Sequence, residues 1–69
     1  MPTYLVVVEQ ARGNLSAYSP DLPGCVATGS DLDEIRQRMA EAIRLHLAGL
    51  QKDGEAIPEP RARAEHVPV

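Results

Sequence analysis

The sequence is poor in aromatic residues: it has two tyrosines and no phenylalanine or tryptophan in 69 residues. Proteins that bind single-stranded nucleic acids stack bases on aromatic side chains and attract phosphates with basic faces. With few aromatics and a net charge of −3, direct DNA or RNA binding is not expected. No apolar run approaches the roughly 20 residues that span a bilayer, and the N-terminus does not have the pattern of a secretory signal peptide, so we predict a cytoplasmic protein without a membrane segment.

Cysteine is also scarce, since Cys25 is the only one and no internal disulfide can form. Cys25, His46 and His66 match no metal-ligand spacing, so neither a metal nor another cofactor is expected. A chain of this length buries only about 60% of the surface that its unfolded form exposes, and small domains need a further source of stability. With disulfides and zinc excluded, we predict self-association into a homodimer or homotetramer.

The order of apolar runs, turns and caps predicts one α+β domain over residues 1–69. Ser30 or Asp31 can cap a helix, because Asp33 or Glu34 follows three residues later. The β-β-β-α-β order places one helix on a three- to four-stranded sheet. The predicted elements are strands at about 3–9, 14–19 and 24–28, a helix at about 31–52, and a short final strand at about 61–67.

The first predicted strand is apolar on both sides, because its alternate residues are Tyr4, Val6 and Val8 on one face and Leu5 and Val7 on the other. One helix covers only one face of a sheet, whereas strands that are apolar throughout are normally buried on both. Leu5 and Val7 are therefore candidate residues of an oligomer interface. The alternative is that the final segment of the chain folds over this face.

Several residues could carry chemistry, but none has the pattern of a catalytic site. Cys25 lacks the flanking signature of a nucleophile and is typical of a small buried residue, so no catalytic residue and no enzyme are expected. His46 falls within the apolar stripe of the helix, either as a histidine at the core margin or as a pH-sensitive contact. Asp31, Asp33 and Glu34 lie where the helix dipole favours negative charge, which explains them without a metal.

The segment Pro20-Asp21-Leu22-Pro23-Gly24 predicts a rigid turn between strands. Two interpretations stay open. The turn is either a sharp corner of the fold or a preformed contact point for a partner.

A set of motifs from Tyr4 to Pro60 resembles the N-terminal domain of the HicB family, the antitoxins of HicA–HicB toxin–antitoxin pairs. The resemblance implies a truncated ribonuclease H-like fold that binds and masks a small, basic, RNA-cleaving HicA-type toxin without any catalysis of its own. Many members continue into a DNA-binding domain, but this chain ends at Val69, so operator binding is not expected. The motifs are Tyr4, Tyr18, Pro20 to Cys25, Gly29, Glu41-Ala42-Ile43, His46-Leu47, Asp53-Gly54 and Ile57-Pro58-Glu59-Pro60.

On this hypothesis the toxin contacts are expected at the rigid turn and at the acidic start of the helix, where charge can complement a basic partner. The alternative is an orphan homo-oligomeric scaffold or small-ligand-binding domain. The residues predicted to contact the partner are Tyr18, Pro20, Asp21, Leu22, Pro23, Asp31, Asp33 and Glu34.

Overall fold

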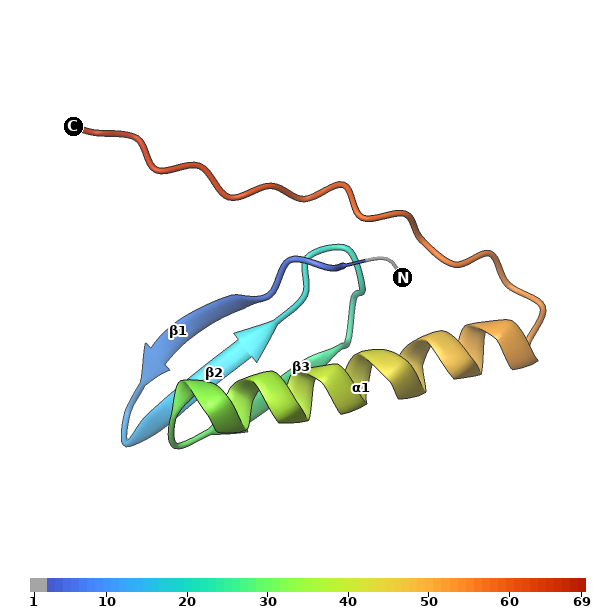
Figure 1. Ribbon diagram of the computed structural model, residues 1–69, viewed down its shortest axis with the longest axis horizontal. Helices are drawn as coiled ribbons and strands as arrows, with labels where there is room; N and C mark the ends of the chain where they lie inside the picture. Colours follow the sequence, from blue (N-terminus) through green and yellow to red (C-terminus); the bar gives the residue numbers. More distant parts are fainter. Residues whose placement is uncertain (1–2) are drawn as a thin grey trace.

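The computed structural model describes residues 3–69 as a three-stranded sheet with one helix packed on it (Figure 1). Strands β1 (Val7–Ala11), β2 (Asn14–Tyr18) and β3 (Val26–Gly29) precede helix α1 (Leu32–Lys52). The sheet is antiparallel in the order β1-β2-β3, so each strand pairs with its neighbour in sequence. The predicted α+β class is confirmed.

The first strand begins further along the sequence than predicted, because it spans Val7–Ala11 instead of residues 3–9. The pairing of β1 with β2 starts at Val7 and Tyr18, and beyond Tyr18 the chain turns away through Ser19 and Pro20. Residues 3–6 therefore have no strand to pair with in the described chain. A side chain ties them down instead, because the Ser19 hydroxyl donates to the Leu5 carbonyl at 3.0 Å.

The helix follows its local signals closely. Asp31 is the N-cap, and its carboxylate accepts from the Glu34 backbone N–H at 2.8 Å. The Glu34 carboxylate accepts in turn from the Ser30 backbone N–H at 3.0 Å, so two amides at the helix start are satisfied. After Lys52 the chain leaves the helix through Gly54, whose φ of 72° suits glycine.

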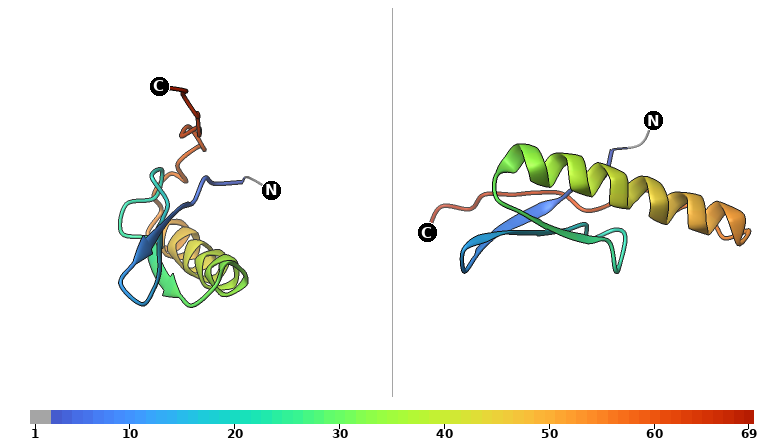
Figure 2. Two further views of the ribbon diagram at one scale, coloured as in Figure 1. Left: turned by 90° about the vertical axis from the view of Figure 1, so that its left-hand side faces the viewer. Right: turned by 90° about the horizontal axis from the view of Figure 1, so that it is seen from below.

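Helix α1 covers one face of the sheet and lies over β2 and β3, not over β1, in the described chain (Figure 2). The core between the layers is small, and seven partly buried hydrophobic residues pack around it. Its buried hydrophobic residues are Ala17, Leu22, Cys25, Ile35 and Met39.

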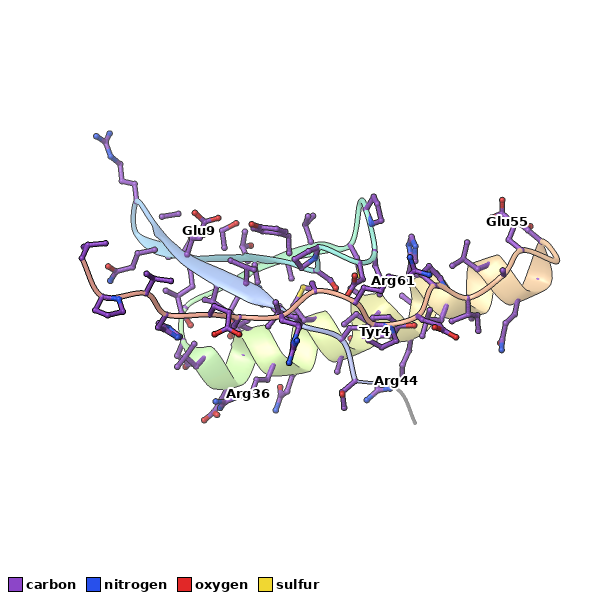
Figure 3. All side chains as sticks on the ribbon, turned by 90° about the horizontal axis from the view of Figure 1, so that it is seen from above. Tyr4, Glu9, Arg36, Arg44, Glu55 and Arg61 are labelled. Carbon is purple, nitrogen blue, oxygen red and sulfur yellow. The ribbon has the colours of Figure 1, made fainter. Side chains whose placement is uncertain are left out.

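The final strand predicted at 61–67 is wrong, because residues 55–69 form no helix or strand. Proline at 58 and 60 removes two backbone donors. The Tyr4 hydroxyl donates to the Pro58 carbonyl at 2.6 Å, and the backbone N–H groups of Arg61 and Ala62 donate to the Asp21 carboxylate. In Figure 3 the Tyr4 side chain lies beside the segment that contains Arg61. Side chains thus hold this segment in place of a ladder, and residues 63–69 then run away from the sheet (Figures 1 and 2).

Candidate protein-binding surfaces

The sheet face opposite α1 carries a row of apolar side chains, which we call the open row. The register places Val7, Tyr18 and Val26 side by side on the three strands. The adjacent row, which contains Ala17, faces the helix and is buried. Tyr18 is 41% exposed and Val26 is 64% exposed, so much of the open row is in contact with water. The residues predicted separately as an oligomer contact, Val7, and as a partner contact, Tyr18, are therefore direct neighbours.

A polar row borders the open row. It consists of Glu9, Ser16 and Thr28, which are paired across the same three strands. The final segment of the chain does not cover this face, since residues 63–69 are all exposed. Leu5 lies before β1 and is half-buried, so its side chain belongs only partly to the surface.

The proline turn is held by a compact set of backbone hydrogen bonds. Ser19 N–H donates to the Cys25 carbonyl at 3.2 Å, and within the turn Leu22 N–H donates to the Ser19 carbonyl at 3.1 Å. Gly24 adopts a φ of 87°, which the turn requires. The Leu22 side chain is 0% exposed and packs in the core, so its predicted role as a partner contact is corrected. Pro20 and Pro23 stay exposed on either side of it.

Asp21 faces its own chain. Its carboxylate accepts from the backbone N–H groups of Arg61 and Ala62 at 3.1 to 3.2 Å. A shallow pocket of about 400 Å³ lies at this junction. Asp21 therefore has a structural task that the sequence did not reveal. The pocket is lined by Pro20, Asp21, Pro23, Pro58, Glu59 and Arg61.

The acidic start of α1 is largely engaged with nearby groups. Asp31 caps the helix, Asp33 pairs with Arg36 at 3.2 Å, and Glu34 pairs with Arg38 at 3.4 Å. These pairs are exposed and contribute little stability, but they offset the negative charge. A contact between this region and a partner stays a prediction.

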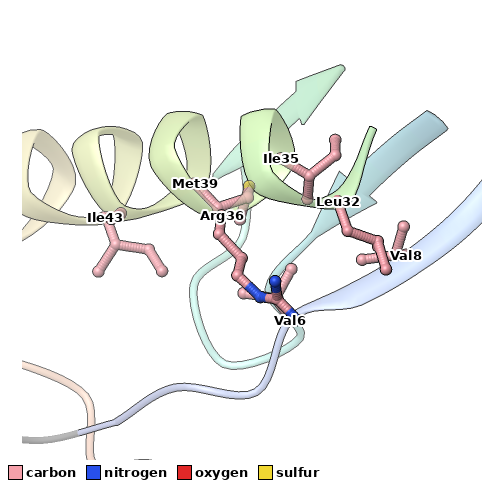
Figure 4. A pocket seen from close by; sticks show the side chains of 8 residues that line it. Val6, Val8, Leu32, Ile35, Arg36, Met39 and Ile43 are labelled. Atoms are coloured by element: carbon pink, nitrogen blue, oxygen red, sulfur yellow. The ribbon is translucent and has the colours of Figure 1, made fainter. Parts of the chain in front are cut away.

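A groove that the sequence did not predict lies between the β1 region and α1, and we call it the β1–α1 groove (Figure 4). It exists because α1 lies over β2 and β3 and leaves the helix-facing side of β1 uncovered. Its volume is about 380 Å³, and Leu32 on its wall is 51% exposed. The sequence held no signal for this groove, because the exposure of Leu32 follows from where α1 lies across the sheet. The groove is lined by Val6, Val8, Leu32, Ile35, Arg36, Met39, Ala40 and Ile43.

The groups considered for chemistry are not assembled into a reactive site. Cys25 is 4% exposed, and burial raises the pKa of its thiol, which keeps the thiol protonated at neutral pH. His46 is half-buried and takes part in none of the side-chain hydrogen bonds of residues 3–69. Within the same residues no three His, Cys, Asp or Glu side chains are grouped to hold a metal. Nor does the described chain contain a helix with both the length and the apolar character needed to cross a membrane.

Comparison with known proteins gives one family and two relatives. The family described as "HicB_like antitoxin of bacterial toxin-antitoxin system" matches residues 4–68. An uncharacterized 14.9 kDa protein of the rep-hol intergenic region of Haemophilus phage HP1 (strain HP1c1) is 32% identical over 56 residues, which are 81% of this chain and 42% of the relative. A UPF0150 protein of Helicobacter pylori (strain J99 / ATCC 700824) is 36% identical over 47 residues, 68% of this chain and 65% of the relative.

The chain therefore spans less than two thirds of either relative. No solved structure matches it significantly.

Proposed function

The chain belongs to the HicB-like antitoxin family of bacterial toxin–antitoxin systems, and on that basis we propose that it binds and masks a HicA-type, RNA-cleaving toxin. It contributes no catalysis to the pair. The proposed setting is the cytoplasm, where such a toxin meets its RNA substrate.

The observation that carries this proposal is the open row. An apolar row that stays in water on one face of a small domain is typical of a protein interface. Tyr18 at its centre belongs to a residue type that is enriched in interfaces, because it offers a large apolar ring with a polar end. Pro20 and Pro23 extend the exposed surface next to it and are fixed by the hydrogen bonds of the turn.

The proposed mechanism is occlusion supported by charge. An enzyme that cleaves RNA needs positive charge to bind phosphates. A partner with a net charge of −3 is attracted to such a surface, and Glu9 places a carboxylate in the row beside the open row. Once bound, the antitoxin sterically blocks RNA from the surface of the toxin. Self-association remains a separate proposal and uses a different surface, described in the next subsection.

The first experiment is affinity purification of the tagged protein from its host lysate at low and high salt, with co-purifying proteins identified by mass spectrometry. We expect a small basic protein that cleaves RNA once it is separated, and that is inhibited when the two are recombined. Recovery of the tagged protein only with copies of itself would overturn the proposal in favour of an orphan homo-oligomer.

The open row is then tested with two matched variants. Val26→Arg places a cation in the row, whereas Leu45→Arg places one on α1, and the two positions are similarly exposed at 64% and 68%. We expect Val26→Arg to weaken toxin binding by about tenfold or more in calorimetry, and Leu45→Arg to leave it unchanged. Equal binding by both variants, with the fold verified by circular dichroism, would contradict the role of the open row.

A further inference from the structure

We propose that residues 63–69 of a second copy of this chain bind along the free edge of β1, with their apolar side chains in the β1–α1 groove. The exchange is reciprocal, so two copies form a closed dimer. The proposal concerns self-association alone and does not depend on a toxin.

The first observation is the state of the final segment. Within the described chain, residues 63–69 take part in no hydrogen bond and are all exposed. Val67 is 76% exposed, and Val69 is fully exposed. The segment is extended and leads away from the domain (Figures 1 and 2). An extended backbone with open donors and acceptors is suited to adding a strand to another sheet.

The second observation is the edge that can receive it. In the described part of the chain the strand order is β1-β2-β3, so β1 pairs there only with β2 and leaves one row of backbone groups unpaired. β3 is the other edge strand, but α1 packs against it and Arg38 already donates to the Thr28 carbonyl at 2.8 Å. The β1 edge is thus the accessible one, and the apolar groove lies beside it.

The side-chain pattern of the segment fits this groove. In an extended chain alternate residues point the same way, so Glu65, Val67 and Val69 share one side. The groove offers apolar walls to the two valines, and Arg36, whose exposed guanidinium also pairs with Asp33, offers a cation to Glu65. Pro68 belongs to the other set, and a proline, which lacks a backbone donor, is tolerated in an edge strand.

A second copy fits better than the segment's own domain. Asp21 fixes the backbone at Ala62, and from there the chain diverges from its own β1 instead of running beside it (Figure 1). Exchange between two copies uses the same surfaces in both, as a twofold dimer requires. It also buries the exposed valines and Leu32 together, which supplies the stability that so small a domain needs.

The proposal is tested by measuring the molar mass of variants of this 69-residue chain by light scattering after size-exclusion chromatography. We expect a dimer for the unmodified chain and at least a tenfold weaker dimer for Val67→Asp with Val69→Asp. Ala64→Asp is the control, because its side chain lies on the other side of the segment, and it should stay dimeric. A monomeric unmodified chain, or a dimer that survives both aspartates, overturns the proposal.

A second test exchanges the charges of Arg36 and Glu65 and asks whether the double variant recovers the dimer. Arg36→Glu alone and Glu65→Arg alone should each weaken the dimer, and the two together should restore it. Failure of the double variant to recover contradicts the pairing of these residues.

Disulfide trapping then distinguishes exchange from folding back. In a Cys25→Ala background, chains with Val8→Cys are mixed with differently tagged chains with Val67→Cys and oxidised. A disulfide between the two tags is expected. A chain that carries both Val8→Cys and Val67→Cys is oxidised in parallel. If the disulfide forms only within this doubly substituted chain, and the chain stays a monomer, the segment folds onto its own β1 and the proposal is wrong. None of these measurements involves a toxin, so the proposed function can fail while this inference stands.

Discussion

Both carboxylate oxygens of Asp21 accept a hydrogen bond from the backbone N–H of Ala62, at 3.2 and 3.1 Å. The two residues are 41 positions apart, and the contact joins the proline turn to the segment that follows the helix. The amide of Arg61 adds a third bond to Asp21 at 3.1 Å. One carboxylate thus sets the point from which the end of the chain leaves the domain.

Removal of this carboxylate should release the segment while the rest of the domain stays folded. Asp21→Ala leaves two amides without their acceptor, and we expect a loss of about 1 kcal/mol together with faster amide exchange at Arg61 and Ala62. Asp21→Asn, which keeps one acceptor oxygen, should give an intermediate effect. Glu59→Ala is the control, since that nearby carboxylate accepts no hydrogen bond in the described chain. Unchanged exchange at Ala62 in Asp21→Ala, measured by NMR, would contradict the contact.

Leu22 is expected to stabilise the fold as a core residue. Its side chain is 0% exposed and packs with Ile35 and Met39. Leu22→Ala leaves a cavity, and buried leucines truncated in this way cost about 2–5 kcal/mol, which is a large part of the stability of so small a domain. Leu45→Ala, at a position that is 68% exposed, should change the unfolding free energy by less than about 0.5 kcal/mol. Similar urea midpoints for the two variants would show that Leu22 is not a core residue.

The helix was predictable because its signals are local. Asp31, Glu34 and Gly54 define its ends within a few residues of sequence, and the observed bounds agree with the prediction to about one residue. The strands were predictable as strands, but the start of β1 depends on where β2 ends, so it moved to Val7. Periodicity gives no information on such a pairing.

The final segment and the site were less predictable, because long-range contacts decide them. Ala62 and the residues around it alternate as a strand would, yet the Asp21 carboxylate takes the amides that a ladder needs. Leu22 lies between two prolines in a surface turn, and only the packed structure shows that it points inward. The β1–α1 groove follows from the position of the helix across the sheet, which no residue pattern specifies.

Substitution of two glycines by alanine should change the unfolding free energy in opposite directions. Gly24 has a φ of 87° and no atom within 4 Å of an added Cβ, so Gly24→Ala should destabilise by about 1 kcal/mol through the backbone alone. Gly49 lies within α1 and also has free space around it, so Gly49→Ala should stabilise by about 0.5–1 kcal/mol. Thermal unfolding of the pair checks both values. Equal shifts of the same sign would contradict the left-handed conformation at Gly24.

The buried thiol of Cys25 should make stability fall at alkaline pH. Burial raises the pKa of this thiol above its ordinary value of 9.0, so the folded chain keeps a proton that the unfolded chain releases. The unfolded state then binds fewer protons as the pH passes about 9, and the unfolding free energy declines with rising pH. Cys25→Ala removes the group, and the difference in unfolding free energy between the two proteins should therefore shrink between about pH 8 and pH 10.5 in urea titrations. A difference that stays constant over this range would mean that the thiol reaches water in the folded state, and a cysteine reagent would then modify it at the rate of an exposed thiol.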